Sequence, residues 1–189
     1  MSSTSGLTAA PVGEVVFTQE EIASAVERIA ARIRADHAPA PLLLVGVLKG
    51  AVMFLGDLMR ALGDYPLSVD FMVVASYGTG RDGGADVRLL KDLDINPTGH
   101  NVVLVEDIVD EGLTLDYLLK NLHSRSPLSV KACALLDKPF HRRVDVRVDY
   151  IGLTAPDEFL VGYGLDHQER YRNLPYICKL PSASRRIER

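Results

Sequence analysis

Runs of apolar residues with little polar alternation, interleaved with amphipathic segments, constrain the fold of this chain more than any other feature. Three such runs are PLLLVGV (41–47), LSVDFMVVAS (67–76) and NVVLVED (101–107). A strand with one solvated face alternates apolar and polar residues, whereas a strand covered on both faces is apolar nearly throughout. The pattern therefore predicts an α/β fold, in which a mostly parallel, twisted sheet is flanked by helices.

The amphipathic segments have the period of helices. The first begins at Thr18, which stands at capping-box spacing from Glu21, and its apolar stripe runs from Ile22 to Ile33. Further helical segments are predicted at residues 51–62 and 112–125, and further strands at residues 129–138, 149–155 and 159–164. Four glycines and few apolar residues in YGTGRDGGADVR predict a mobile loop after the second strand.

The length of 189 residues favours one domain, which we place at residues 14–182, between a flexible N-terminal tail (1–13) and a C-terminal tail (183–189). No apolar run approaches the roughly 18 to 20 residues of a membrane helix, and the N-terminus lacks the features of a secretory signal. Cys133 and Cys178 have no CxxC spacing, so we expect buried thiols. These features indicate a cytoplasmic protein without membrane contact.

The charge pattern limits the choice of ligand. A formal net charge of -4 argues against a general nucleic-acid binder, but it allows a small anionic ligand. The five histidines show no metal-ligand spacing, and we expect all of them at the surface or in loops. No zinc site is therefore predicted.

Four carboxylates crowd the end of the third strand, in VVLVEDIVDEGLT (102–114). Asp110 and Glu111 alone could be ordinary acidic residues of a helix first turn. That explanation does not cover Glu106 and Asp107, which follow an apolar strand and prefer water to an apolar surrounding. Because ligands of open parallel sheets bind at the carboxyl ends of the strands, the group of four indicates a functional site.

The turn that follows has the features of a phosphate site. Gly112 and Thr114 stand at the start of a predicted helix, where free backbone N–H groups and the helix dipole favour an anion. Carboxylates beside a phosphate cradle suggest a ligand that carries a phosphate together with hydroxyls or a metal.

The thirteen-residue pattern resembles the phosphoribosyl-pyrophosphate signature of type I phosphoribosyltransferases, and the resemblance extends over about residues 14 to 182. It implies a small hood formed by the N- and C-terminal segments beside the sheet, and a homodimer or homotetramer. By the same resemblance, Glu106 and Asp107 hold the ribose hydroxyls or the waters of a magnesium ion, which keeps few protein ligands. The phosphate turn of residues 111 to 114 includes Leu113, and Asp110 is the candidate general base.

Three other segments resemble the hypoxanthine-guanine branch of this family. Leu48, Lys49 and Gly50 match its pyrophosphate loop, which has a cis peptide between the first two residues. Ser76 and Tyr77 match the start of a mobile catalytic loop that excludes water. By themselves, Lys49 would be an ordinary solvated lysine and the glycine-rich stretch a plain surface loop.

The third segment lies toward the C-terminus and concerns the base. The resemblance implies that Lys138 donates to the purine 6-oxo group, that Phe159 stacks on the base, and that the backbone at Leu160 and Asp166 reads its other edge. It makes Asp166 a second magnesium ligand. An ammonium donor suits a carbonyl oxygen and disfavours an exocyclic amine, so hypoxanthine and guanine are expected over adenine.

The resemblance also implies that Arg172 contacts the pyrophosphate. A planar guanidinium is well suited to this role. Considered singly, Arg172 would be a surface charge and Phe159 a core residue. The implied reaction transfers ribose 5-phosphate from phosphoribosyl pyrophosphate to the purine. Two alternatives stay open: a phosphoribosyltransferase for another base, such as xanthine or adenine, and a non-catalytic regulator that binds nucleotide or RNA.

Glu111 departs from the family pattern, in which a Ser or Thr is usual at this position. A hydroxyl can donate to a phosphate, whereas a carboxylate repels it by about 4 kcal/mol for unit charges about 4 Å apart at an effective dielectric constant of about 20. We expect the Glu111 side chain to point to solvent, so that backbone N–H groups hold the phosphate.

Overall fold

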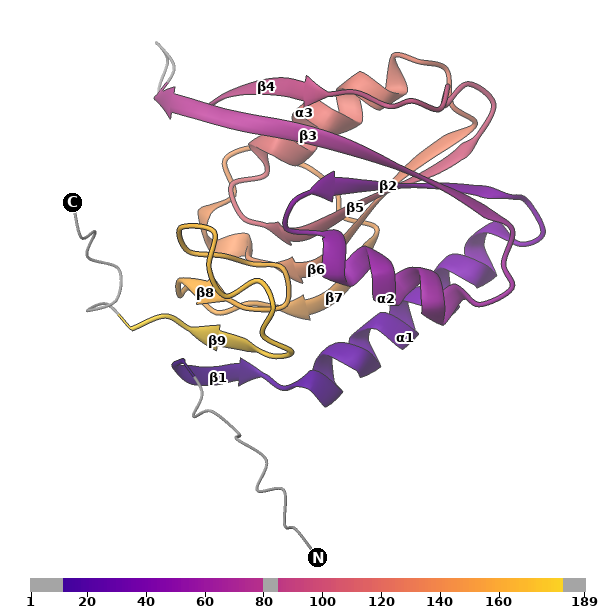
Figure 1. Cartoon of the computed structure of the whole chain (residues 1–189). Coiled ribbons are helices and arrows are strands. Elements are labelled where there is room, and N and C mark those ends of the chain that lie inside the picture. Colours follow the sequence, from indigo (N-terminus) through magenta and orange to yellow (C-terminus); the bar gives the residue numbers. More distant parts are fainter. Residues whose placement is uncertain (1–11, 80–84, 182–189) are drawn as a thin grey trace, which may run out of the picture.

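The computed structural model describes residues 12–79 and 85–181, without the side chains of residues 76–86 (Figure 1). A six-stranded sheet has the order β4-β3-β2-β5-β6-β7. Its strands are β2 (Leu42–Leu48), β3 (Leu67–Thr79), β4 (Ala85–Lys91), β5 (Asn101–Val109), β6 (Ser129–Asp137) and β7 (Tyr150–Thr154). Only β4 runs antiparallel to its neighbour, so the predicted mostly parallel α/β sheet is confirmed.

Helices cover both faces of this sheet. α1 (Gln19–His37) and α2 (Val52–Leu62) pack on one face, and α3 (Leu113–His123) packs on the other. Alternate residues of each central strand face opposite cores: Leu44 and Val103 lie in the core under α1 and α2, and Leu43 and Val102 lie under α3. Burial on both faces is the physical reason why these strands lack polar alternation.

The start of α1 follows the sequence pattern in detail. The Thr18 hydroxyl accepts from the backbone N–H of Glu21, and the Glu21 carboxylate accepts from the backbone N–H of Thr18, so the predicted capping box is present. The predicted stripe from Ile22 to Ile33 is buried. The cap fixes where β1 (Glu14–Phe17) ends and the helix begins.

A second, three-stranded antiparallel sheet joins segments from the two ends of the described chain. Its order is β1-β9-β8, where β8 spans Leu160–Val161 and β9 spans Ile177–Lys179. This sheet is the predicted hood, and it lies on the side toward which the parallel strands point (Figure 1). A short 3-10 helix, η1 (Pro139–His141), follows β6.

Several boundaries differ from the expectation. The strand predicted at residues 159–164 is reduced to the two residues of β8. β5 continues through Glu106 and Asp107 to Val109, because its ladder with β6 extends to the pair Val109↔Asp137. The predicted loop of residues 77–88 begins instead as the end of β3, in which Ser76 and Tyr77 pair with Val87 and Asp86 of β4. Residues 80–84 of that loop lie outside the described part of the chain.

The predicted tails also lie largely outside the described residues. Val12 and Gly13, the last residues of the predicted N-terminal tail, lie against the hood: a Cβ on Gly13 would stand 2.0 Å from the backbone oxygen of Lys179. Cys133 and Cys178 are buried free thiols, as expected. Within the described residues, no helix has the length and apolar character needed to cross a membrane.

The expectation that every histidine lies at the surface or in a loop is wrong for His37. This residue ends α1, is 8% exposed, and has its Nε2 3.2 Å from the Tyr150 hydroxyl. The same hydroxyl donates to Asp36 (2.8 Å), and Lys131 donates to both Asp36 (2.8 Å) and Tyr150 (3.1 Å). This polar cluster connects the end of α1 to β6 and β7.

We expect His37 to make the fold sensitive to mild acid. Burial, followed by the neighbouring Lys131 ammonium, lowers the pKa of His37 from the ordinary 6.5, against the opposing effect of Asp36 and Asp149. The unfolded chain therefore takes up this proton first as the pH falls, and the free energy of unfolding decreases below about pH 6.5. Between about pH 7.5 and 5.5, the melting temperature should fall more for the wild type than for His37→Asn. Equal falls would contradict this role.

Candidate active site

The predicted site residues gather at the carboxyl ends of the parallel strands. Lys49 and Gly50 follow β2, Asp110 and Glu111 follow β5, and Lys138 follows β6. This edge is where an open α/β sheet leaves space between its connections. The site is therefore assembled from segments far apart in the sequence by the order of the strands.

The phosphate turn is shaped by a glycine. Gly112 is the N-cap of α3 and has a φ of +84°, a left-handed conformation that L side chains rarely adopt. A Cβ there would also lie 2.8 Å from the Val146 side chain. The turn lines a cavity of about 280 Å³ with these residues: Glu106, Ile108, Val109, Asp110, Glu111, Gly112, Leu113, Thr114 and Leu115. The first N–H groups of α3 have no partner within the helix and are suited to an anion.

Two carboxylates of β5 stand beside this turn: Glu106 is buried, and Asp107 is partly exposed. Glu106 is 6% exposed, and burial together with the neighbouring Asp107 charge raises its pKa well above the ordinary value. Burial raises the pKa of Asp107 to about 6, although a hydrogen bond from the backbone of Ile108 and the charge of Arg172 act in the other direction. Both groups hold a negative charge at a cost in free energy, which a bound cation or hydroxyl donors would offset.

The pyrophosphate-loop segment packs directly on Asp107. The Leu48–Lys49 peptide bond is cis. A Cβ on Gly50 would stand 1.8 Å from Asp107 Oδ2, and a Cβ on Gly164 would stand 2.0 Å from the backbone oxygen of Gly50. Only glycines allow the end of β2, the end of β5 and the hood to approach this closely.

Charged side chains of the hood surround the same segment. Arg172 contacts Asp166 (2.8 Å) and donates to the backbone oxygen of Gly164 (2.7 Å). The Glu169 carboxylate lies 3.1 Å from Lys49 Nζ and 3.4 Å from Arg172 Nη2. The two cations that the resemblance assigns to pyrophosphate thus already share one anion.

Lys138 and Asp110 lie side by side at the ends of neighbouring strands. Lys138 is 12% exposed, and its Nζ is 3.5 Å from Asp110 Oδ2 and 3.3 Å from Asp157 Oδ1. The other oxygen of Asp110 is buried and has no hydrogen-bond partner among the described residues. An unpartnered acceptor beside an ammonium group can take a proton from a bound ligand.

The two residues expected to contact the base from the hood differ in exposure. Phe159 is 40% exposed, and its ring meets that of His167 edge to face at 5.5 Å. Leu160 is buried in β8, where it pairs with Lys179 of β9. An exposed aromatic ring of this kind can stack on a planar ligand.

Glu111 turns toward a cation. Its carboxylate lies 3.6 Å from Arg143, and its backbone oxygen accepts from the Arg143 N–H at 3.0 Å. The side chain is 47% exposed. This arrangement is compatible with a phosphate held by backbone N–H groups alone.

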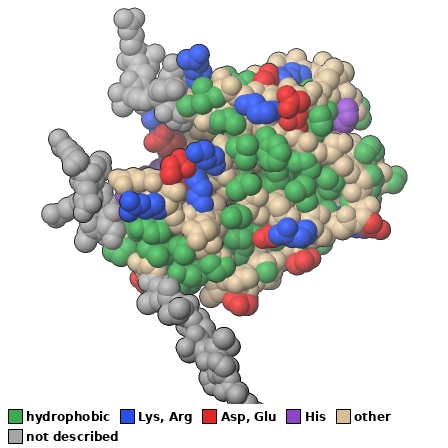
Figure 2. All heavy atoms as spheres, in the orientation of Figure 1, with side chains coloured by type: hydrophobic (Ala, Val, Ile, Leu, Met, Phe, Trp, Pro, Cys, Tyr) green, Lys and Arg blue, Asp and Glu red, His purple; other side chains and the backbone are tan. Residues whose placement is uncertain are grey.

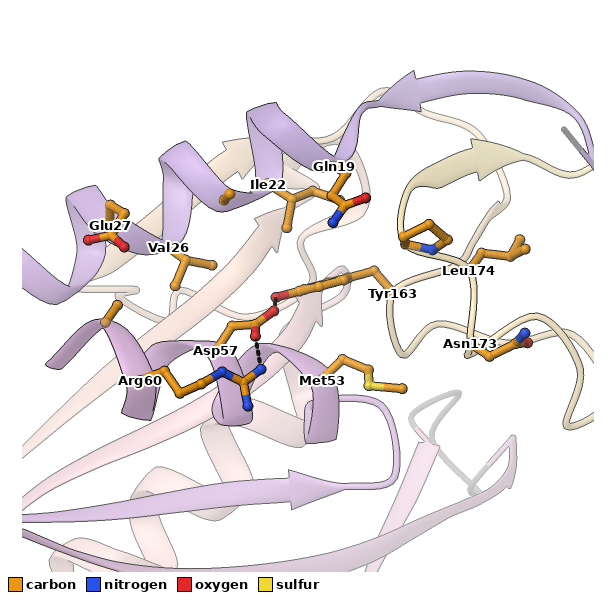
Figure 3. Close-up of a pocket in the computed structure, with 13 residues that line it drawn as sticks. Gln19, Ile22, Val26, Glu27, Met53, Asp57, Arg60, Tyr163, Asn173 and Leu174 are labelled. Atoms are coloured by element: carbon orange, nitrogen blue, oxygen red, sulfur yellow. Dashed lines mark hydrogen bonds and ion pairs between the residues drawn. The ribbon is translucent and has the colours of Figure 1, made fainter. Parts of the chain in front are cut away.

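A larger cavity of about 480 Å³ lies elsewhere, between α1, α2 and the hood (Figure 3). Its lining contains none of the residues that the sequence analysis assigned to the site. Tyr163 points from the hood toward α2 and donates to Asp57, which also pairs with Arg60. These polar groups satisfy one another, so they are not poised for a ligand.

Several residues of the site were not anticipated. Asp157 contacts Lys138, Glu169 contacts Lys49, and Arg142 pairs with Asp137 at the end of β6. The rule that places ligands at strand ends could have singled out Asp137 and Asp157, which end β6 and follow β7. Within the described residues, no group of three or more His, Cys, Asp or Glu side chains is arranged to hold a metal ion.

Comparison with known proteins places this site in a family. The phosphoribosyl transferase domain family matches residues 14–168. The hypoxanthine-guanine phosphoribosyltransferase of Bacillus subtilis is 42% identical over 172 residues, which cover 91% of this chain and 95% of the relative. The hypoxanthine phosphoribosyltransferase of Salmonella typhimurium is 44% identical, over 88% of this chain and 94% of the relative.

A solved structure agrees with these relatives. The crystal structure of a hypoxanthine phosphoribosyltransferase from Staphylococcus aureus superposes with a TM-score of 0.87 at 41% identity, and the match covers 92% of this chain and 94% of that one. Sequence and fold thus match over nearly the same span. The chain belongs to the phosphoribosyl transferase family, among the hypoxanthine-guanine phosphoribosyltransferases.

Proposed function

We propose that this protein is a purine-salvage enzyme that transfers ribose 5-phosphate from phosphoribosyl pyrophosphate to N9 of hypoxanthine or guanine. The products are IMP or GMP and pyrophosphate. The observation that carries the proposal is the placement of Asp110 and Lys138 side by side, next to the cavity of the phosphate turn. This arrangement offers a base and a hydrogen-bond donor to a purine whose ribose phosphate occupies the turn.

The phosphate end of the substrate binds through the backbone. The N–H groups of residues 111 to 114 surround the 5′-phosphate, and the dipole of α3 favours its charge. The cis peptide segment at Lys49 and Gly50 contacts the pyrophosphate together with Arg172. Binding of the pyrophosphate must displace Glu169 from the two cations that it contacts. Ser76 and Tyr77 would contribute from β3, the strand next to β2.

The carboxylates of Glu106 and Asp107 fit a divalent cation. Their raised pKa values indicate negative charge that lacks compensation, and Mg²⁺ is commonly held by one or two carboxylates together with substrate oxygens. Glu106 and Asp107 would hold the ribose hydroxyls or the waters of one Mg²⁺, and Asp166 would hold a second. When bound, the cation neutralises charge on the departing pyrophosphate.

The base is recognised at three of its edges or faces. Lys138 donates to the 6-oxo group, Phe159 stacks on the ring, and the backbone at Leu160 and Asp166 contacts the opposite edge. As the C1′–N9 bond forms and the bond from C1′ to pyrophosphate breaks, Asp110 accepts the proton from N7. Its negative charge also stabilises the positive charge that develops on the sugar.

Location and assembly complete the proposal. Buried free thiols at Cys133 and Cys178 support a reducing, cytoplasmic location. The resemblance implies a homodimer or homotetramer. Hydrophobic side chains gather on the face that carries α2, where Val52 and Met53 are 43% and 40% exposed, and this face supports self-association (Figure 2).

Initial rates with phosphoribosyl pyrophosphate and Mg²⁺ against hypoxanthine, guanine, xanthine and adenine test the function. We expect turnover with the first two bases and none with adenine, because an ammonium donor has no acceptor on an exocyclic amine. A preference for xanthine would support the alternative enzyme. A folded protein that is inactive with every base would support the regulator.

Asp110→Asn should retain the fold and lose turnover by a factor of about 10² to 10⁴, the usual contribution of a general base. The amide has the same shape but accepts a proton poorly. Circular dichroism checks the fold, and single-turnover rates check the chemical step. Unchanged turnover in a folded variant would remove Asp110 from this role.

Glu111→Ser should change the Michaelis constant for phosphoribosyl pyrophosphate by less than about tenfold, because Arg143 and solvent already screen this carboxylate. Steady-state kinetics at saturating base measure the constant. A larger decrease would mean that the Glu111 charge opposes the phosphate directly.

A further inference from the structure

The ends of three neighbouring strands place charged groups in a row. Asp110 follows β5, Lys138 follows β6 and Asp157 follows β7, and the strand order brings Lys138 between the two carboxylates. Asp157 Oδ1 is 3.3 Å from Lys138 Nζ and 2.9 Å from His141 Nε2. The hydrogen bond to His141 has the largest effect on the pKa of Asp157, the hydrogen bond to Lys138 the second largest, and both lower it. Asp157 is therefore an anion next to the lysine.

The Lys138 ammonium is surrounded by three acceptors, and it is close to none of them. Its distances are 3.5 Å to Asp110, 3.3 Å to Asp157 and 3.4 Å to the backbone oxygen of Glu158. Charge-assisted N–H···O bonds are usually about 2.7 to 2.9 Å long. The ammonium group is thus held in the middle of its partners, with 12% of the side chain exposed.

The reaction demands that Lys138 and Asp110 act separately. Lys138 must donate to the 6-oxo group while Asp110 accepts the N7 proton. If Asp110 were the only carboxylate near Lys138, the two side chains would form a tight ion pair. The Lys138 donor and the Asp110 acceptor would then bind each other instead of the purine. A second carboxylate on the far side of the lysine prevents this closure.

We infer that Asp157 is a positioning residue for base recognition: it holds Lys138 away from Asp110, so that the ammonium is free to bind the 6-oxo group. This inference rests on the proposed function. His141 supports the arrangement, because its ring nitrogen contacts the same Asp157 oxygen and limits rotation of that carboxylate. Asp157 does not touch the reacting atoms and acts only through Lys138.

The test compares the Michaelis constants of the two substrates. In Asp157→Asn, the constant for hypoxanthine should rise about tenfold or more, and that for phosphoribosyl pyrophosphate should change by less than about twofold, since only the base contacts Lys138. Asp157→Glu, which keeps the charge, should recover part of the loss. His141→Ala should give a smaller rise in the same constant.

Asp92→Asn is a matched control. Asp92 is 48% exposed and pairs with Arg125 at 2.8 Å, whereas Asp157 is 51% exposed and pairs with Lys138. Asp92 follows β4 and lies outside the residues assigned to the site, so both constants should stay at their wild-type values. Circular dichroism and melting temperatures verify that every variant is folded.

The outcomes separate this inference from the function on which it rests. A wild-type protein that turns over no base contradicts the proposed function and the inference with it. An active wild type with equal rises in both constants for Asp157→Asn, or with no rise in the hypoxanthine constant, overturns the positioning role alone. If Asp157→Asn does not fold, an unchanged hypoxanthine constant in a folded His141→Ala variant overturns the positioning role as well.

Discussion

The close approach of three backbone segments around Asp107 is the constraint on which the rest of the site depends. Gly50 presses on the Asp107 carboxylate, and Gly164 presses on the backbone of Gly50. Neither position has room for a side chain. The contact fixes the pyrophosphate loop, the acidic end of β5 and the hood relative to one another. Most groups assigned to the substrate are attached to these three parts; Lys138 after β6 and Ser76 and Tyr77 in β3 are not.

This contact also explains why the acidic residues are costly to the fold. Desolvation of Asp107, on which Gly50 packs, raises the pKa of Asp107 to about 6. Glu106 is buried more deeply and has a like charge beside it. Such an arrangement weakens the ligand-free protein and strengthens interactions with whatever supplies positive charge or hydroxyl donors. Stability and binding therefore make opposite demands on these two residues.

Sequence reasoning was reliable where local patterns carry the information. The apolar strands, the capping box at Thr18 and the glycine at the phosphate turn each have a physical signature within a few residues. Prediction from the sequence was weaker where the contacts of a residue depend on how distant elements pack. His37 is buried at the end of α1, where it contacts Tyr150 of β7, a residue 113 positions away in the sequence.

The same limit applies within the site. Counting glycines after Ser76 indicated a loop, whereas pairing with β4 carries the strand further. Asp157 stands in a plain turn after β7, and only the order of β5, β6 and β7 reveals its contact with Lys138. Interactions of this kind depend on tertiary structure: the strand-end rule can single out Asp157 as a site residue, but it does not identify Lys138 as its partner.

The hood and the phosphate turn should form at different stages of folding. β1 pairs with β9, so residues 14 and 179 meet across almost the whole described chain, whereas the phosphate turn connects two consecutive elements, β5 and α3. Contacts of large sequence separation form late because the intervening chain must first lose its freedom. We therefore expect a folding chain to possess the phosphate turn before it possesses the Phe159 and Leu160 side of the base pocket. A growing polypeptide that lacks residues 177–179 has no hood sheet at all.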